Sequence, residues 1–305
     1  MNVNLSIKIG KLKLKNPVMV ASGTFGYAEE FSDFINLKEL GAIVTKTITL
    51  NPRRGNLPPR TCETPAGMLN SIGLENPGLE VFLKDKLPFL KKLGIPVIIS
   101  IASEDDPKEF IELAKRINKI DAISALELNI SCPNVAGQKT LISQDPKATY
   151  QAVKSVRKVT SKVLITKLSP NVTSINEIAQ SAEDAGSDAV SLINTLSGMS
   201  IDVESRRPKL GAITGGLSGP AVRPVALKMV WDVYNKIKIP IIGMGGIMDT
   251  LSALEFIIAG AAAISVGTAN FINPKTSVEI ISGLKEYLRR NKINAIGRLT
   301  GNLKI

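Results

Sequence analysis

Histidine is absent from this chain of 305 residues, which also has only two cysteines, one tryptophan and 4% aromatic residues. Without histidine, proton transfer near neutral pH falls to cysteine, lysine, a carboxylate, a hydroxyl or a cofactor. The two cysteines, Cys62 and Cys132, are too few for a disulfide scaffold and too far apart for a metal or iron–sulfur site. We therefore predict no metal site and at least one free thiol.

Long hydrophobic runs are also missing. The two longest, residues 239–247 and 256–264, are interrupted by glycine, proline or polar residues and are shorter than a bilayer span. The first fifteen residues alternate polar and apolar side chains, unlike a signal peptide. With 44% hydrophobic and 21% charged residues, the chain can bury a full core. We expect a cytoplasmic protein without a membrane segment, folded as a single domain over residues 1–305.

The net charge of +11 is compatible with an RNA partner, an anionic substrate or a lysine-rich surface. Single-strand binding needs basic residues interleaved with aromatic ones, and no such run is present. This favours the solvated surface, and we predict no nucleic-acid partner.

Short apolar runs rich in β-branched residues recur along the chain and are typical of strands buried on both faces. They lie at 17–21, 42–45, 97–100, 125–130, 163–167, 189–194, 239–243 and 262–267. Eight such strands alternating with helices predict a (β/α)8 barrel of the TIM type, with a doubly wound sheet as the alternative. Residues 5–14 alternate around Gly10, which predicts an N-terminal β-hairpin that plugs the bottom of the barrel.

Helix signals separate these runs. Asp145-Pro146 supplies an N-cap and a first-turn proline, and Ser174 with Glu177 forms a capping-box pattern. Asp249 predicts another helix start, with Gly260 at the end of that helix, and Asn273-Pro274 predicts the last helix.

Three connections, 47–78, 131–144 and 195–218, are too long for simple turns. All three follow strands, so they lie on the catalytic face of a barrel, where long loops are usually lids or binding loops rather than decorative insertions.

The predicted strand ends carry the candidate chemistry. Lys46 and Lys167 each end an apolar strand, and a cation buried there needs an anionic partner unless it reaches solvent. Gly245-Gly246 and Gly267-Thr268 follow the seventh and eighth strands, where barrels bind phosphate through backbone N–H groups. Cys132 follows the fourth strand. It is either a small buried residue or a base activated by a neighbouring cation, whereas Cys62 is assigned to structure.

Four segments resemble the class 1 dihydroorotate dehydrogenases, in particular the class 1B branch. Residues 64–78 (TPAGMLNSIGLENPG) resemble the family's substrate loop, and 129–134 (NISCPN) its catalytic loop. Residues 214–220 (TGGLSGP) resemble the flavin-contacting loop, and 243–246 with Gly267-Thr268 the phosphate site.

The resemblance implies an FMN-dependent enzyme of pyrimidine biosynthesis that oxidises dihydroorotate to orotate. Cys132 would remove the C5 proton while hydride passes from C6 to N5 of FMN, with Lys46 and Lys167 as the other catalytic residues. The implied FMN ligands are Ser22, Lys46, Thr47, Asn129, Lys167, Ile193, Gly219, Gly245, Gly246, Gly267 and Thr268. The implied substrate ligands are Lys46, Asn70, Ser71, Ile72, Gly73, Leu74, Asn129, Asn194 and Thr195.

The class 1B branch further implies a homodimeric core and an electron-transfer subunit that carries FAD and an iron–sulfur cluster. This chain departs from the family pattern at Ser100, where asparagine is common, and in the lid at 135–139, which lacks the usual Gly-Gly. The physiological electron acceptor therefore stays open. Two alternatives remain: a tRNA-dihydrouridine synthase, although only about thirty-eight residues follow the eighth strand, and a non-catalytic flavin-binding subunit.

Overall fold

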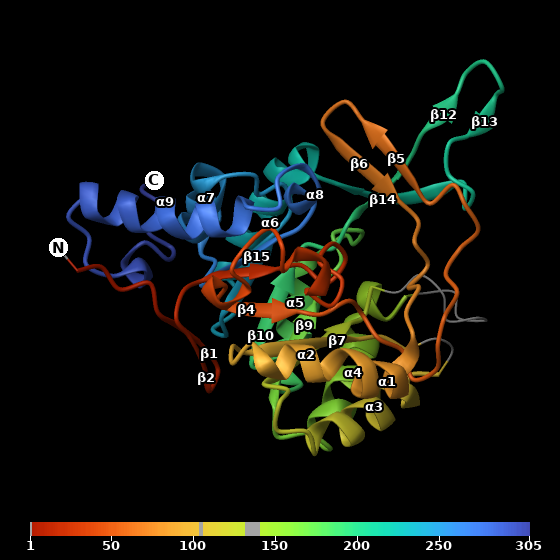
Figure 1. The fold of residues 1–305 in the computed structure, drawn as a ribbon, viewed down its shortest axis with the longest axis horizontal. Coiled ribbons are helices and arrows are strands. Elements are labelled where there is room, and N and C mark those ends of the chain that lie inside the picture. Colours follow the sequence, from red (N-terminus) through yellow and green to blue (C-terminus); the bar gives the residue numbers. More distant parts are fainter. Residues whose placement is uncertain (1, 104–105, 132–140) are drawn as a thin grey trace.

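The computed structural model describes residues 2–103, 106–131 and 141–305. Eight parallel strands close into a barrel in the order β10-β15-β16-β3-β4-β7-β8-β9, with β9 pairing β10 to complete the ring (Figure 1). Their bounds are β3 (Val18–Val20), β4 (Ala42–Val44), β7 (Val97–Ile101), β8 (Ala125–Asn129), β9 (Val163–Lys167), β10 (Ala189–Leu192), β15 (Ile241–Met244) and β16 (Ala263–Val266). The predicted (β/α)8 barrel is confirmed, and closure of the sheet excludes the doubly wound alternative.

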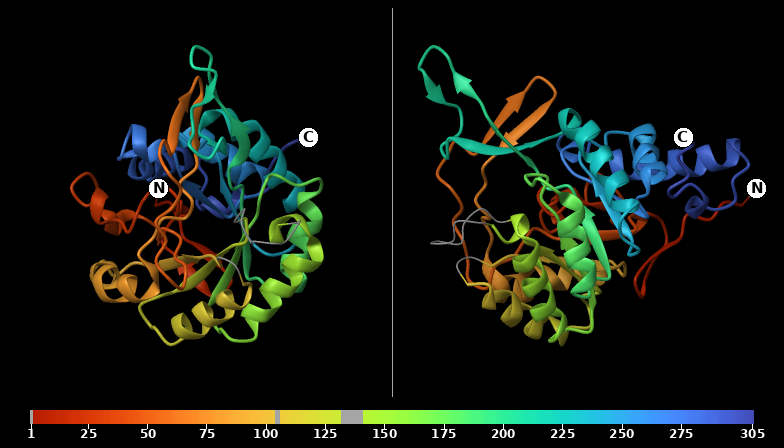
Figure 2. Two further views of the ribbon diagram at one scale, coloured as in Figure 1. Left: turned by 90° about the vertical axis from the view of Figure 1, so that its right-hand side faces the viewer. Right: turned by 180° about the vertical axis from the view of Figure 1, so that it is seen from behind.

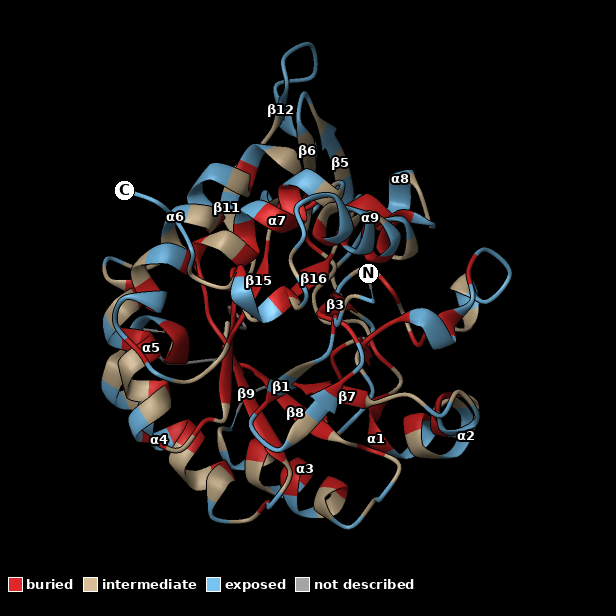
Figure 3. Ribbon diagram, turned by 90° about the vertical axis from the view of Figure 1, so that its left-hand side faces the viewer, coloured by how far each residue is buried: buried red, intermediate tan, exposed pale blue. Residues whose placement is uncertain are grey.

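Every residue of these eight strands is buried, which explains why they appear in the sequence as continuous apolar runs. The helices form a ring outside the strands, with their buried faces turned inward (Figure 3). They are α1 (Gly78–Val81), α2 (Leu87–Lys92), α3 (Lys108–Asn118), α4 (Pro146–Arg157), α5 (Ile175–Asp184), α6 (Arg223–Tyr234), α7 (Thr250–Ala259), α8 (Ala269–Ile272) and α9 (Thr276–Arg290). A π-helical turn over Phe82–Lys86 joins α1 to α2. In the described part of the chain, the helices are too short or too polar to cross a bilayer.

Two of the predicted helix starts have the expected caps. The Asp145 carboxylate accepts a hydrogen bond from the backbone N–H of Lys147 at 2.8 Å, and α4 begins at Pro146. At α7, Asp249 and Ser252 form a reciprocal capping box, and Gly260, with a φ of +127°, ends the helix.

The other two starts need correction. Helix α5 follows Ser174 as predicted, but the Ser174 side chain accepts no capping hydrogen bond, so the predicted capping box is wrong. Helix α9 begins at Thr276, later than predicted, because the Asn273 side chain accepts from the backbone N–H of Lys275 and holds a turn ahead of the helix.

The N-terminal hairpin plugs the barrel as predicted. Strands β1 (Ile7–Ile9) and β2 (Leu12–Leu14) pair antiparallel, with Gly10 in the turn at a φ of +54°. Ile9 and Leu14 are fully buried and pack with the inward-facing side chains of the barrel strands. Burying one such side chain stabilises a fold by about 1.5–3 kcal/mol. The hairpin therefore closes the amino end of the barrel.

A second, antiparallel sheet stands beyond the opposite end of the barrel (Figures 1 and 2). It joins the long connections 47–78 and 195–218 in the order β11-β14-β6-β5. The bounds are β5 (Thr61–Thr64), β6 (Gly67–Asn70), β11 (Leu196–Met199) and β14 (Thr214–Ser218), with the small hairpin β12 (Ile201–Asp202) and β13 (Arg207–Pro208) at its tip. The two connections expected as loops are thus partly regular structure, and Cys62 lies in β5.

Candidate active site at the carboxyl end of the barrel

Polar side chains from four strand ends meet across the carboxyl end of the barrel. The Lys167 ammonium, at the end of β9, donates to the Ser22 hydroxyl, just after β3, at 3.3 Å. Beside them, the Asn194 amide, which follows β10, donates to Oδ1 of Asn129 at the end of β8, also at 3.3 Å. Four of the predicted site residues are thus brought together, where barrel enzymes carry their active sites.

Lys167 is the cation of this group and is deeply enclosed, with 7% of its side chain exposed. Its Nζ lies 4.0 Å from Oε1 of Glu127, a buried carboxylate on β8 that the sequence analysis did not single out. The signal was present in the sequence, because Glu127 is a charged residue inside an otherwise apolar strand run. A buried charge has to be paired, so this cluster is held by mutual attraction as well as packing.

Lys46 and Thr47 follow β4. Lys46 is half-buried and its backbone N–H donates to the Gly26 carbonyl at 2.8 Å. The hydroxyls of Thr47 and Ser100 share a hydrogen bond of 2.9 Å, and both residues are buried. Ser100, where the chain departs from the family's asparagine, therefore supports Thr47 from the neighbouring strand.

The glycine-rich strand ends come together with the loop after β14. Gly245 and Gly246 have φ values of +123° and +75°, and Gly219 has +92°. A Cβ added to Gly246 would lie 2.7 Å from Cβ of Arg223 and 2.9 Å from the Gly219 carbonyl oxygen. Glycine at position 246 therefore lets this strand end pack closely against α6 and the Gly219 loop, where a side chain would clash.

Two further predicted residues border this glycine cluster. A Cβ on Gly245 would lie 3.3 Å from Cγ1 of Ile193, and the Thr268 hydroxyl donates to the Ser218 hydroxyl at 2.8 Å. Gly267 differs, because an added Cβ would make only ordinary contact with Ala21, at 3.7 Å. Its position adjoins the cluster, but no steric need for glycine is evident there.

The predicted substrate loop, 70–74, leaves the end of β6. The Asn70 amide donates to the Gly216 carbonyl at 3.3 Å, tying the loop to β14. The Ser71 hydroxyl is buried and has no hydrogen-bond partner among the described residues. Gly73 and Leu74 both have positive φ, at +73° and +57°, so the loop turns sharply through Ile72–Leu74 without regular structure.

Asn76, which the sequence analysis did not assign, anchors this loop. Its Oδ1 accepts from the backbone N–H groups of Thr49 and Gly78, and its Nδ2 donates to the Thr49 hydroxyl and the Leu74 carbonyl. Because these four hydrogen bonds satisfy the buried Asn76 amide, they fix the end of the loop relative to β4.

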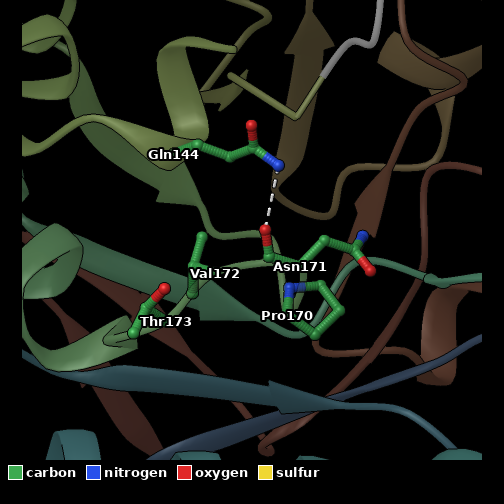
Figure 4. A pocket seen from close by; sticks show the side chains of 5 residues that line it. All are labelled: Gln144, Pro170, Asn171, Val172 and Thr173. Carbon is green, nitrogen blue, oxygen red and sulfur yellow. Dashed lines mark hydrogen bonds between the residues drawn. The ribbon is translucent and has the colours of Figure 1, made fainter. Parts of the chain in front are cut away.

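Asn171 is a second unassigned anchor, in the connection after β9 (Figure 4). Its Nδ2 donates to the Thr195 carbonyl at 3.0 Å, its Oδ1 accepts from the backbone N–H of Ser197 at 2.9 Å, and its own carbonyl accepts from Gln144 at 3.0 Å. Thr195 in turn donates its N–H to the Asn194 side chain at 2.9 Å. Asn171 therefore holds the backbone beside two predicted substrate ligands. A surface hollow opens between Gln144 and the Asn171 connection.

Cys132 and most of the predicted lid, residues 132–140, lie outside the described residues. Ser131 is the last described residue before them, and its hydroxyl contacts the Lys167 carbonyl at 3.5 Å.

A closed (β/α)8 barrel whose carboxyl end brings together a buried lysine, paired asparagines and clustered glycines has the architecture of a barrel enzyme. The family model described as dihydroorotate dehydrogenase matches residues 4–288, and the chain belongs to that family of oxidoreductases. The resemblance noted in the sequence is thus confirmed.

Individual relatives agree over nearly full length. The chain is 54% identical to a protein of Desulforamulus reducens over 99% of both chains, and 52% identical to one of Trichlorobacter lovleyi over 98% of both. It is 49% identical to a protein of Thermoanaerobacter pseudethanolicus over 99% of this chain and 100% of the other. All three are named dihydroorotate dehydrogenase B (NAD(+)), catalytic subunit.

Proposed function

We propose that this chain oxidises dihydroorotate to orotate in pyrimidine biosynthesis, with FMN bound at the carboxyl end of the barrel. The observation that carries the proposal is the convergence of Lys167, Asn129 and Asn194 at that end. Full-length similarity to relatives named for this reaction supports it.

The residues present fit FMN. Lys167 has three N–H donors, of which the Ser22 hydroxyl takes one, so donors remain for the flavin. The clustered glycines Gly219, Gly245 and Gly246, with Thr268, suit a phosphate because bare backbone N–H groups can surround it. The other proposed ligands are Ser22, Lys46, Thr47, Asn129, Ile193 and Gly267. FMN supplies the two-electron acceptor for the hydride that leaves C6 of the substrate.

The amides suit the substrate. Asn70, Asn129 and Asn194 each offer both donors and acceptors, as a pyrimidine with an imide and a carboxylate requires. The loop 71–74, Thr195 and Lys46 complete the proposed set, and the buried unpaired hydroxyl of Ser71 is available to a ligand.

We assign proton removal to Cys132. The thiolate would take the C5 proton and the hydride would leave C6 for the flavin, so that the C5–C6 single bond of dihydroorotate becomes the double bond of orotate. When FMN is bound, Lys167 would supply positive charge to the flavin as it gains electrons, and Lys46 would contact both flavin and substrate.

The same proposal includes a partner. The relatives are named as catalytic subunits of NAD(+)-linked enzymes, from which we infer a separate electron-transfer subunit bearing FAD and an iron–sulfur cluster. We further propose a homodimeric core, a single FMN-binding domain over 1–305 and a cytoplasmic location. The purified chain should then reduce NAD(+) slowly or not at all, and full NAD(+) activity of this chain by itself would contradict the partner.

The function is tested by mixing the FMN-loaded protein with dihydroorotate without oxygen. Visible flavin absorbance should bleach as one orotate forms per flavin, whereas dihydrouracil, which lacks the carboxylate, should bleach it far more slowly. A protein that holds FMN but is not reduced by dihydroorotate would match the non-catalytic alternative instead.

A further inference from the structure

Glu127 is a carboxylate in the middle of a fully buried barrel strand, with 3% of its side chain exposed. An ionised carboxylate in such a place is costly unless hydrogen bonds and an opposite charge compensate it. The reaction proposed above gives Glu127 no role, so its placement needs an explanation.

Its two oxygens have different surroundings. Oε2 accepts a hydrogen bond of 3.0 Å from the Ser191 hydroxyl on β10, which is itself fully buried. Oε1 accepts no hydrogen bond from any described residue, and its charged neighbour is Lys167 Nζ at 4.0 Å. Ser191 thus fixes the carboxylate so that its free oxygen faces the ammonium.

The ammonium is held from two sides. Ser22 Oγ lies 3.3 Å away across the barrel, and Glu127 lies at a distance that suits an ion pair rather than a hydrogen bond. The carboxylate therefore attracts Lys167 without using up its N–H donors. Because both side chains are shielded from water, each feels the other's charge strongly.

We propose that Glu127 is a positioning residue that holds the Lys167 ammonium at the barrel mouth and sets how much of its positive charge reaches the bound cofactor. The proposal rests on the function proposed above, since it assumes that FMN lies against Lys167. Reduced flavin gains negative charge, so Lys167 favours the reduced form and Glu127 opposes it. Neutralising Glu127 should raise the flavin potential, and neutralising Lys167 should lower it.

The test measures the midpoint potential of bound FMN, and the FMN affinity of the apoprotein, in Glu127→Gln, Lys167→Met and the double variant. In Glu127→Gln, the affinity for reduced FMN relative to that for oxidised FMN should rise roughly tenfold. For a two-electron couple this raises the midpoint potential of the bound flavin by about 30 mV. Lys167→Met should shift the potential the other way. Ser191→Ala keeps both charges and removes only the hydrogen bond that orients the Glu127 carboxylate, so it should move the potential much less than Glu127→Gln does.

If Glu127→Gln does not fold because a lone cation is left inside the barrel, the double variant restores charge balance and can be compared with Lys167→Met. Because Glu127 acts through Lys167, its neutralisation should have less effect in the Lys167→Met background than in the wild type. An unchanged potential in Glu127→Gln, or equal shifts in both backgrounds, would overturn the proposal. A wild-type protein that takes up no FMN would instead refute the proposed function.

Discussion

At its amino end the barrel is filled by Ile9 and Leu14 of the hairpin, whereas at its carboxyl end Asn129 and Lys167 terminate β8 and β9 beside the polar side chains of Asn194 and Ser22. The apolar end lowers the free energy of the fold by removing hydrocarbon from water. The polar end raises the free energy of the fold, because it keeps a cation, a carboxylate and several amides partly desolvated. Apolar burial at the amino end therefore offsets the desolvation of the charged groups at the carboxyl end.

The largest expected effect is at the carboxyl end. Replacing Cys132 with serine should slow flavin reduction by dihydroorotate by about 10²–10⁴-fold, the usual contribution of a general base, because a hydroxyl is a much weaker base than a thiolate near neutral pH. Stopped-flow absorbance measures the rate, and the FMN content of the variant serves as its control. A variant that keeps the wild-type rate would remove the thiol from the mechanism.

At the amino end the corresponding change is Leu14→Ala. It should lower the free energy of unfolding by about 2–5 kcal/mol, because it leaves a cavity in the plug, while kcat per folded molecule stays the same. Urea unfolding measures this. Lys13→Ala, on the exposed side of the same strand, is the matched control and should change stability by less than about 0.5 kcal/mol. A large loss of kcat in folded Leu14→Ala would contradict the assignment of stability to the amino end and of activity to the carboxyl end.

Gly246→Ala should weaken FMN binding by a factor equivalent to about 1–3 kcal/mol, since the new Cβ meets Arg223 and the Gly219 carbonyl at a φ of +75°. Fluorescence titration of the apoprotein with FMN measures the affinity. Gly297→Ala, in the 3-10 turn Ile296–Arg298 away from the proposed site, is the comparison, because a Cβ there meets no atom within 4 Å and should change the affinity little. Equal losses in both variants would show that strain at Gly246 is not the cause.

Asn171→Ala tests an anchor that is not itself a predicted ligand but holds the backbone of one, Thr195. Losing its bonds to the Thr195 carbonyl and the Ser197 N–H, each worth about 1 kcal/mol, should raise the KM for dihydroorotate several-fold with FMN still bound. Gln144→Ala removes only one exposed contact to the Asn171 carbonyl and should leave KM near the wild-type value. If kcat falls instead while KM is unchanged, Asn171 acts on the chemical step rather than on substrate binding.

The smallest expected effect comes from a structural group at the catalytic end. The Ser252 N–H donates to the Asp249 carboxylate and lowers the pKa of that carboxyl below its ordinary value of 3.8. The cap therefore contributes fully at pH values above 3.8, and its contribution is lost as the pH falls through the lower value of the folded state. Asp249→Ala should lower the free energy of unfolding by about 1 kcal/mol at neutral pH, and by less at an acidic pH where the Asp249 carboxyl of the folded protein is protonated. Urea midpoints at the two pH values check this, and an equal cost at both would contradict the cap.

The barrel was predictable because each of its strands is buried on both faces, and such strands form uninterrupted apolar runs in the sequence. The second sheet was not, because β6 and β14 are rich in glycine and polar residues and their pairing joins positions as distant as Asn70 and Gly216. No local pattern specifies a partner so far along the chain.

The candidate site shows the same contrast. Lys167 and Asn129 stand at strand ends, so their meeting follows from the fold. Asn76 and Asn171 act through hydrogen bonds to backbone far along the chain, at Thr49 and Thr195, and these depend on loop paths that the sequence does not encode locally. Glu127 could have been found, since a lone charge inside an apolar strand needs a buried partner.

The most direct test of the account is a structure of the protein with FMN and orotate bound. The flavin ring should lie at the carboxyl end against Lys167 and Asn129, with the phosphate at Gly246 and Thr268 and orotate between the flavin and Asn70. Ligands found anywhere else, such as the amino end closed by Ile9 and Leu14, would contradict it.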